Sequence, residues 1–311
     1  MQKIILATTM FFLFSFAAFD IPAQEKYTLR NRYPQGIYEM KTEMDMNMKV
    51  KHEDQIIPNH TVQTQYQEIV ADAVEPDGSQ RVHNEMKRIL LKQTINGREI
   101  VFDSADEKSK NSPLRMLGVM VGLKTTMNFD KDGKVTEIEG LDEFLEKNSQ
   151  TFPKQAYELL KKTLNKQALT KTFDILREVM PQQPVAIGEQ WKSENFAEIP
   201  LIGKVKTTQT NTLKEIQNVD GKELAVIVSQ SSIKSDTPQE LNMPVAKMTL
   251  KSTDIDSENT IQMELKTGLV VSNITQIKMN IAIESTVNNK IIQQNMTGEG
   301  KTTMTITRSE K

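Results

Sequence analysis

A stretch near the N-terminus alternates strictly between two kinds of side chain. From Tyr38 to Val50, Tyr, Met, Thr and Val occupy every second position, and acidic, basic or amide residues occupy the positions between them. A β-strand points successive side chains to opposite faces, so the pattern predicts a strand with one apolar and one charged face. At about 3.3 Å per residue this strand would extend roughly 40 Å, well beyond the usual strand length.

The same alternation returns in both halves of the chain, interrupted by turn sequences. Asn96-Gly97 lies between two alternating runs and predicts a β-hairpin. Asp220-Gly221 and Thr267-Gly268 mark further turns in the second half. Helical periodicity is found mainly between residues 141 and 181, where apolar residues recur every three or four positions. Strands, a helical block and strands again therefore follow one another along the chain.

This order predicts an α+β fold. We expect a long, curved, half-barrel-like antiparallel sheet with a central helical block packed on one face. Residues 1–23 are predicted to form a signal peptide and residues 24–311 a single β-rich domain. The domain divides into three parts, a first β half, a helical block and a second β half, at residues 24–140, 141–181 and 182–311. No Pro- or Ser-rich linker separates the halves, which favours one continuous domain.

The first two dozen residues have the pattern of a secretory signal peptide. Lys3 supplies a positive charge, residues 4–19 are mostly apolar, and Ala23 is a small residue before a polar stretch. The apolar run is short for a membrane span, which needs about 20 residues. We therefore expect an exported chain that is soluble after signal cleavage, periplasmic or extracellular, with no transmembrane span in its mature part.

The composition excludes several classes of site. The chain has no cysteine, which removes disulfides, thiolate metal sites and cysteine nucleophiles. The 39 Lys and Arg residues nearly balance the 41 Asp and Glu residues, and no dense basic run is present. This pattern argues against a nucleic-acid partner. We expect no cofactor, because no cofactor-binding motif is complete.

One segment matches the spacing of a calcium-binding loop. Oxygen-bearing side chains fall at positions one, three, five and twelve of that loop, which are Asn128, Asp130, Asp132 and Glu139. Such a loop needs a helix before it, whereas residues 123–129 alternate as a strand does. We therefore interpret the segment as a hairpin turn and expect no metal site.

No other segment carries a complete catalytic motif. The three histidines, His52, His60 and His83, lack metal-ligand spacing with one another, and there is no Gly-x-Ser-x-Gly elbow. Residues 297–302 resemble a phosphate-binding loop only in part, because a strand-like segment follows where a helix is needed. We expect the protein not to be an enzyme. A hydrolase would require a pocket with a buried histidine or a carboxylate pair.

The apolar face of the first long strand is rich in methionine. Its large side chains are Tyr38, Met40, Met44, Met46 and Met48. The apolar face of a strand is usually core, so ordinary packing is the favoured interpretation. The functional alternative is a ligand-lining wall, since flexible methionine side chains adapt to apolar ligands of variable shape.

Several short motifs resemble a family of secreted bacterial proteins known as domain of unknown function 6263. They are Tyr27-Thr-Leu29 with Gly36-Ile-Tyr38, Asp130-Lys-Asp-Gly133-Lys-Val135 with Gly140, and Pro184 with Gly188-Glu-Gln-Trp191. The resemblance covers nearly the whole mature chain and implies no activity or catalytic residues. The pattern is also similar to envelope lipoprotein carriers, which are curved half-barrels that hold lipid or acyl chains.

The leading functional hypothesis is non-catalytic binding of an apolar or lipid-like ligand in the cell envelope. It depends on the methionine stripe, the long strands and the export signal. The alternative is a structural or protein-interaction module of the envelope without a small ligand. A fold alone does not decide between them.

Overall fold

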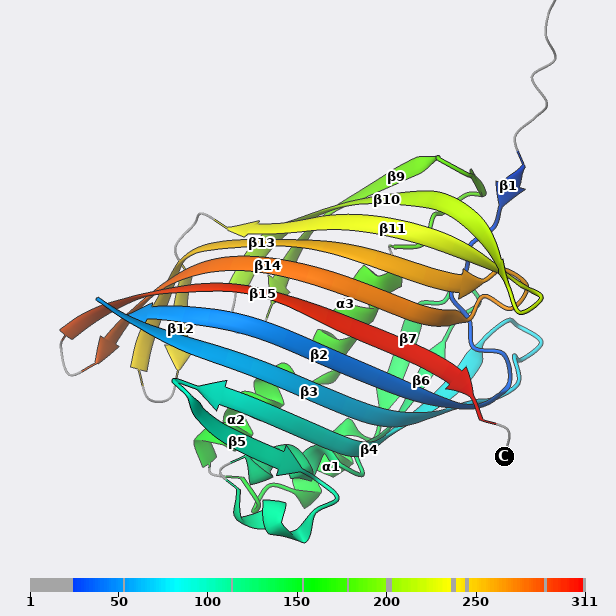
Figure 1. Ribbon diagram of the computed structural model, residues 1–311. Coiled ribbons are helices and arrows are strands. Elements are labelled where there is room, and N and C mark those ends of the chain that lie inside the picture. The colour runs from blue at the N-terminus through cyan, green and yellow to red at the C-terminus, as the bar shows by residue number, and fades with distance from the viewer. Residues whose placement is uncertain are drawn as a thin grey trace, which may run out of the picture.

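A computed structural model describes residues 25–309, except residues 53, 113, 153, 178, 200–202, 236–238, 244–245 and 288–289. The predicted signal peptide, residues 1–23, lies outside the described residues. Nearly all of the strands in the described part belong to one antiparallel sheet of thirteen strands (Figure 1). A separate two-stranded sheet pairs β1 (Lys26–Tyr27) with β8 (Val185–Ala186).

The strands of the large sheet lie in the order β7-β6-β4-β3-β2-β15-β14-β13-β11-β10-β9, with β5 beside β4 and β12 beside β13. Their bounds are β2 (Gly36–His52), β3 (Gln55–Ala71), β4 (Gln80–Ile95), β5 (Arg98–Asp103), β6 (Lys124–Phe129), β7 (Val135–Glu139), β9 (Gln190–Ile199), β10 (Gly203–Val219), β11 (Lys222–Ser235), β12 (Gln239–Met243), β13 (Ala246–Glu264), β14 (Val270–Val287) and β15 (Lys290–Arg308). The long strands bend along their length, so the sheet is curved (Figure 1).

The predicted first strand is confirmed as β2, which is 17 residues long. It pairs on one side with β3, its neighbour in sequence, and on the other with β15, the last strand. The predicted hairpins are also confirmed. Asn96 and Gly97 both have positive φ, as do Asp220 and Gly221, which is the backbone that a two-residue hairpin turn requires.

The predicted α+β class is wrong. The segment with helical periodicity does form helices, namely α1 (Leu141–Lys147), α2 (Lys154–Thr163) and α3 (Lys166–Arg177), but all are short. Two 3-10 helices, Glu107–Asn111 and Arg115–Met120, precede them. Among the described elements, the main contacts between helices and the sheet join α3 to β7 and α1 to β6, which lie at one edge of the sheet. The fold is therefore mostly β, and no central helical block packs across a face of the sheet.

One face of the sheet carries the buried apolar side chains, and we call it the core face. On β2 this is the face of Tyr38, which forms a buried cluster with Ile69 of β3, Val82 of β4 and Ile306 of β15. A second cluster packs on the core face around Ile227 of β11. Its buried members are Leu29, Val179, Val185, Leu213, Ala225, Ile227, Ile261, Met263 and Val270. Segments on either side of the helices thus cover part of this face.

The opposite face, which we call the polar face, carries the residues that alternate with the core. On β2 these include Asp45 and Asn47, and both are exposed. The two faces therefore follow the alternation of the sequence. Side chains at paired positions on neighbouring strands lie on the same face, so the register assigns each residue to one of the two.

Candidate functional site

The predicted ligand-lining residues all lie on the core face of β2, but they divide into two groups. Tyr38 is 1% exposed, and its hydroxyl donates a hydrogen bond to the carbonyl of Pro34. Burial raises the pKa of the Tyr38 hydroxyl above its usual value. Met40 packs against the same cluster. These two side chains are thus part of the core, as the packing interpretation predicts.

Met44, Met46 and Met48 continue the core face of β2 beyond this cluster and are only half-buried. They belong to none of the four buried clusters formed by the described residues. Two strands away, Ile277 and Met279 of β14 lie on the same face and are also half-buried. We call these five side chains the methionine patch.

Two glycines of β15 lie at the centre of the methionine patch, between its residues on β2 and β14. Gly300 pairs with Met46 and Ile277, and Gly298 pairs with Met48 and Met279. A Cβ atom added at Gly298 would lie 3.1 Å from Cγ of Met48 and 3.3 Å from Cγ of Met279. The glycines therefore let the flanking apolar side chains close over the β15 backbone. The segment that partly resembled a phosphate loop is thus a strand that shapes an apolar surface.

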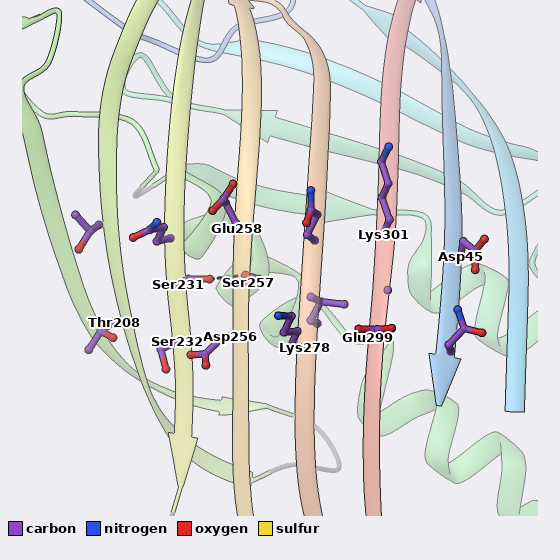
Figure 2. Close-up of a pocket in the computed structure, with 16 residues that line it drawn as sticks. Asp45, Thr208, Ser231, Ser232, Asp256, Ser257, Glu258, Lys278, Glu299 and Lys301 are labelled. Carbon is purple, nitrogen blue, oxygen red and sulfur yellow. Dashed lines mark hydrogen bonds between the residues drawn. The ribbon is translucent and has the colours of Figure 1, made fainter. Parts of the chain in front are cut away.

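A groove is lined mainly by polar-face residues (Figure 2), together with four core-face residues, namely Ser231, Ser257, Ile277 of the methionine patch and Gly300. It has a volume of about 790 Å³ and is lined by residues of β2, β10, β11, β13, β14 and β15. From β2 it takes Asp45 and Asn47, whose positions alternate with those of the methionines. None of the five predicted ligand-lining residues contributes to it.

Opposite charges face one another across the strands of this groove. Lys278 lies between Glu299 on one neighbouring strand and Asp256 on the other, and Lys301 is paired with Asp45. Opposite charges at paired positions stabilise a sheet by about 0.2–1 kcal/mol each. The charged residues of the groove are exposed, and each lysine faces a carboxylate, so these pairs present no concentrated field of one sign to a ligand.

Two of the three histidines, His60 and His83, form contacts on the polar face, whereas His52 lies on the core face of β2. The ring of His83 lies 2.9 Å from the hydroxyl of Thr126 and 3.3 Å from the carboxylate of Asp72. This hydroxyl–imidazole–carboxylate order is that of a hydrolytic triad. However, the His83 and Asp72 side chains are 41% and 48% exposed, and neither lines the groove. His83 and Thr126 are simply paired in register across β4 and β6.

The segment that matched a calcium loop is a hairpin between β6 and β7. Oδ1 of Asp130 accepts hydrogen bonds from the amides of Asp132 and Lys134, both at 2.9 Å, and so closes its own turn. Oδ1 of Asn128 accepts from Arg81. Glu139 is at the far end of β7, paired with Thr126. The spacing therefore does not gather the four residues, and no metal-binding group of His, Asp or Glu is found among the described residues.

A row of polar side chains crosses the core face beside the methionine patch, and the sequence analysis missed it. The row comprises Gln209, Asn211, Ser229, Ser231, Ser257, Asn259 and Thr275, from β10, β11, β13 and β14, and we call it the polar belt. Nε2 of Gln209 donates to Oδ1 of Asn211 at 3.0 Å and to Oγ of Ser229 at 2.9 Å. Asn211 and Ser229 are completely buried.

Further hydrogen bonds continue the polar belt toward the methionine patch. The hydroxyls of Ser231 and Ser257 lie 2.7 Å apart (Figure 2), and Thr275 donates to Oδ1 of Asn259 at 2.6 Å. Two buried amide atoms, Nδ2 of Asn211 in the belt and Oδ1 of Asn273 beside it, have no hydrogen-bond partner among the described residues. Leaving such a group unpaired costs about 1–3 kcal/mol.

The fold defines a mostly-β protein built on one large antiparallel sheet. A model of a family of unknown function, DUF6263, matches residues 77–270, more than half of the chain. The chain therefore belongs to this family, and the predicted resemblance is confirmed. No curated protein matches the sequence.

Several solved structures resemble the chain weakly. A lipovitellin structure that concerns lipid–protein interactions shares 10% identity with a TM-score of 0.44, over 90% of this chain and 26% of that one. The chain thus spans about a quarter of that protein. The translocator domain of the autotransporter NalP from Neisseria meningitidis shares 7% identity with a TM-score of 0.21, covering 87% and 89% of the two chains. The COG4313 outer membrane channel from Pseudomonas putida F1 shares 4% identity with a TM-score of 0.24, covering 89% and 97%.

These similarities are too low to carry an argument about fold or function. Among the described helices, none combines the length and the apolar character needed to cross a membrane.

Proposed function

We propose that the protein binds an apolar or lipid-like ligand without catalysis, and that it does so as an exported protein of the cell envelope. One observation carries the proposal: the methionine patch is an apolar surface on the core face whose side chains belong to none of the buried core clusters. Tyr38 on the same strand face is 1% exposed, whereas Met44, Met46 and Met48 are half-buried.

The chemistry of the patch suits a ligand of variable shape. Methionine side chains are unbranched and polarizable, and they repack around different apolar partners. Gly298 and Gly300 remove side chains from the middle of the patch, so Met48 and Met279 approach each other across β15. An acyl chain laid on this surface would be in contact with flexible side chains from two strands.

The experiment combines native mass spectrometry with a binding assay. Protein purified from its own host is expected to carry a non-covalent adduct that organic solvent extracts. The adduct-free protein is expected to bind N-phenyl-1-naphthylamine, an uncharged apolar fluorophore, with increased fluorescence. A bare mass in repeated preparations together with no fluorophore binding would reject the proposal.

Matched variants locate the binding surface. Met46→Gln keeps the length of the side chain but places an amide in the patch, and we expect it to weaken fluorophore binding roughly tenfold, since half-burying a methionine side chain contributes about 1–1.5 kcal/mol. Asn47→Gln, one residue further along β2, changes the polar face and is expected to leave binding unchanged. Equal effects of the two substitutions would show that the ligand does not lie on the core face.

A second candidate function is an interaction module without a small ligand. It is favoured by Ile56 and Ile291, which are 60% and 66% exposed, near the start of β3 and the start of β15. Both strands pair antiparallel with β2, so both side chains lie at one end of the sheet. This function predicts a bare chain by mass spectrometry and an assembly that the double variant Ile56→Ser, Ile291→Ser dissociates.

A further inference from the structure

The polar belt and the methionine patch adjoin each other on one face of the sheet. Thr275 of the belt is two residues before Ile277 of the patch on β14, and Ser257 of the belt is paired with Ile277. The core face therefore changes from hydrogen-bonding side chains to apolar ones within a single strand. A surface divided in this way fits a molecule that is itself divided into a polar and an apolar part.

The burial of the belt shows which part of it a ligand could reach. Its far end, at Asn211 and Ser229, is completely buried, whereas Asn259 and Thr275 beside the patch are half-buried. The hydroxyl of Thr275 and the amide oxygen of Asn259 are hydrogen-bonded to each other. The accessible end of the belt is thus the end that meets the methionine patch.

Asn273 adds a polar group whose presence packing does not explain. It lies on the core face of β14, two residues before Thr275, and is paired with Ile261 on one side and Met304 on the other. Its Oδ1 atom is buried without a hydrogen-bond partner among the described residues. An apolar side chain at this position would be more stabilising, because an unpaired buried acceptor is destabilising.

We propose that Asn259, Asn273 and Thr275 bind the polar head of an amphiphile whose apolar chain lies on the methionine patch, and that this head is uncharged. The proposal rests on the proposed function and specifies its ligand class. All seven belt residues and Asn273 are neutral, and burying an ionised head against neutral groups is costly. A hydroxyl, ester or amide head supplies the donors and acceptors that amide and hydroxyl side chains bind. The ligand class is therefore a neutral amphiphile such as a monoacylglycerol or a fatty alcohol.

One charged group offers another way to bind the polar head of a ligand. Arg177, the last residue of α3, has its Nε atom buried without a partner among the described residues. A head held by Arg177 rather than by the belt would be anionic. Comparing a neutral and an anionic amphiphile with the same acyl chain therefore separates the two.

The test measures displacement of N-phenyl-1-naphthylamine by monooleoylglycerol and by oleate from the adduct-free full chain. We expect monooleoylglycerol to bind about tenfold more tightly, the value of one net hydrogen bond. Thr275→Val, which keeps the shape of the side chain, should remove this preference while the fluorophore still binds. The matched control is Thr303→Val, a half-buried threonine of β15 on the polar face, which should retain the preference.

A second variant distinguishes loss of the head site from misfolding. Asn273→Leu makes the row from Ile261 to Met304 continuously apolar, so we expect it to unfold at the same temperature as the natural chain or higher, yet to lose the preference for the neutral head. Equal affinities of the two amphiphiles, tighter oleate binding, or an unchanged preference in both variants would overturn the assignment of the head site while leaving the proposed function intact. Absence of fluorophore binding to the natural chain, together with a bare mass in native mass spectrometry, would overturn both.

Discussion

The turn at Gly268 offers a sharp test of how the N-terminal segment is held to the sheet. Gly268 has φ +79°, a left-handed conformation that costs most L-residues about 1–2 kcal/mol. A Cβ atom there would also clash with the carbonyl oxygen of Arg30 and would lie 3.4 Å from the amide of Arg32. That same amide donates to the Gly268 carbonyl at 3.0 Å. Gly268→Ala therefore adds strain and forces the segment at residues 30–32 away from the turn.

A matched control separates the two costs. Gly221 has φ +78°, almost the same value, but a Cβ atom there would meet nothing within 4 Å. Gly221→Ala should cost about 1–2 kcal/mol for the backbone conformation alone. Gly268→Ala should cost about 2 kcal/mol more, from overpacking and the loss of a hydrogen bond.

The assay is thermal and urea unfolding of both variants, followed by far-ultraviolet circular dichroism. A chain of this size loses about 2–4 °C in Tm per kcal/mol, so Gly268→Ala should melt roughly 4–8 °C below Gly221→Ala. Limited proteolysis should also cut the Gly268→Ala variant sooner near residue 30. Equal melting temperatures of the two variants would refute the inferred close packing of the N-terminal segment.

Three further predictions concern the core and the surface. Ile227 is completely buried and Ile291 is 66% exposed, so substitution by alanine should cost about 2–5 kcal/mol at the first position and under 0.5 kcal/mol at the second, by urea unfolding. The guanidinium of Arg88, bound to both carboxylate oxygens of Asp103, holds the pKa of Asp103 below its ordinary 3.8. The folded chain thus binds that proton less tightly than the unfolded chain. Asp103→Asn should therefore lose stability at pH 7, by at most about 1 kcal/mol for a pair this exposed, and the loss should vanish as the pH falls below about 3.8. A difference in stability that persists at pH 2 contradicts this. Trp191→Phe, which removes a 3.0 Å hydrogen bond to a core carbonyl, should cost about 1–3 kcal/mol, and an unchanged urea midpoint would contradict the bond.

Local patterns in the sequence predicted the strands well, because the apolar and polar faces of a strand appear as alternating residues in its own sequence. The alternating run from Tyr38 to Val50 lies within β2, and the Asn-Gly turn is where it was expected. The partner of β2 could not be predicted, because β15 is at the opposite end of the chain and pairing depends on distant residues. The helices were located, but helical periodicity does not reveal how little of the sheet they contact.

The candidate site was predicted only in part. Alternation placed the five β2 residues on one face, but it could not show that Tyr38 and Met40 join the core while the next three methionines extend past it. The polar belt was missed because serine, threonine and asparagine in a strand resemble a solvent-facing row. The available signal was that apolar Val205 and Leu213 lie on the same face of β10 as Gln209 and Asn211, at either end of the polar row.

The pairing of β2 with β15 has a consequence for how the chain reaches its folded state. β2 is synthesised long before β15, yet the two meet in the interior of the sheet. Until residue 308 is available, β2 and β14 each present one long edge whose backbone groups have no partner strand. Such edges recruit other chains, and closing a contact between distant segments is slow. We therefore expect removal of β15 to convert the protein into aggregating halves, and folding to depend on protection of these two edges until β15 is synthesised.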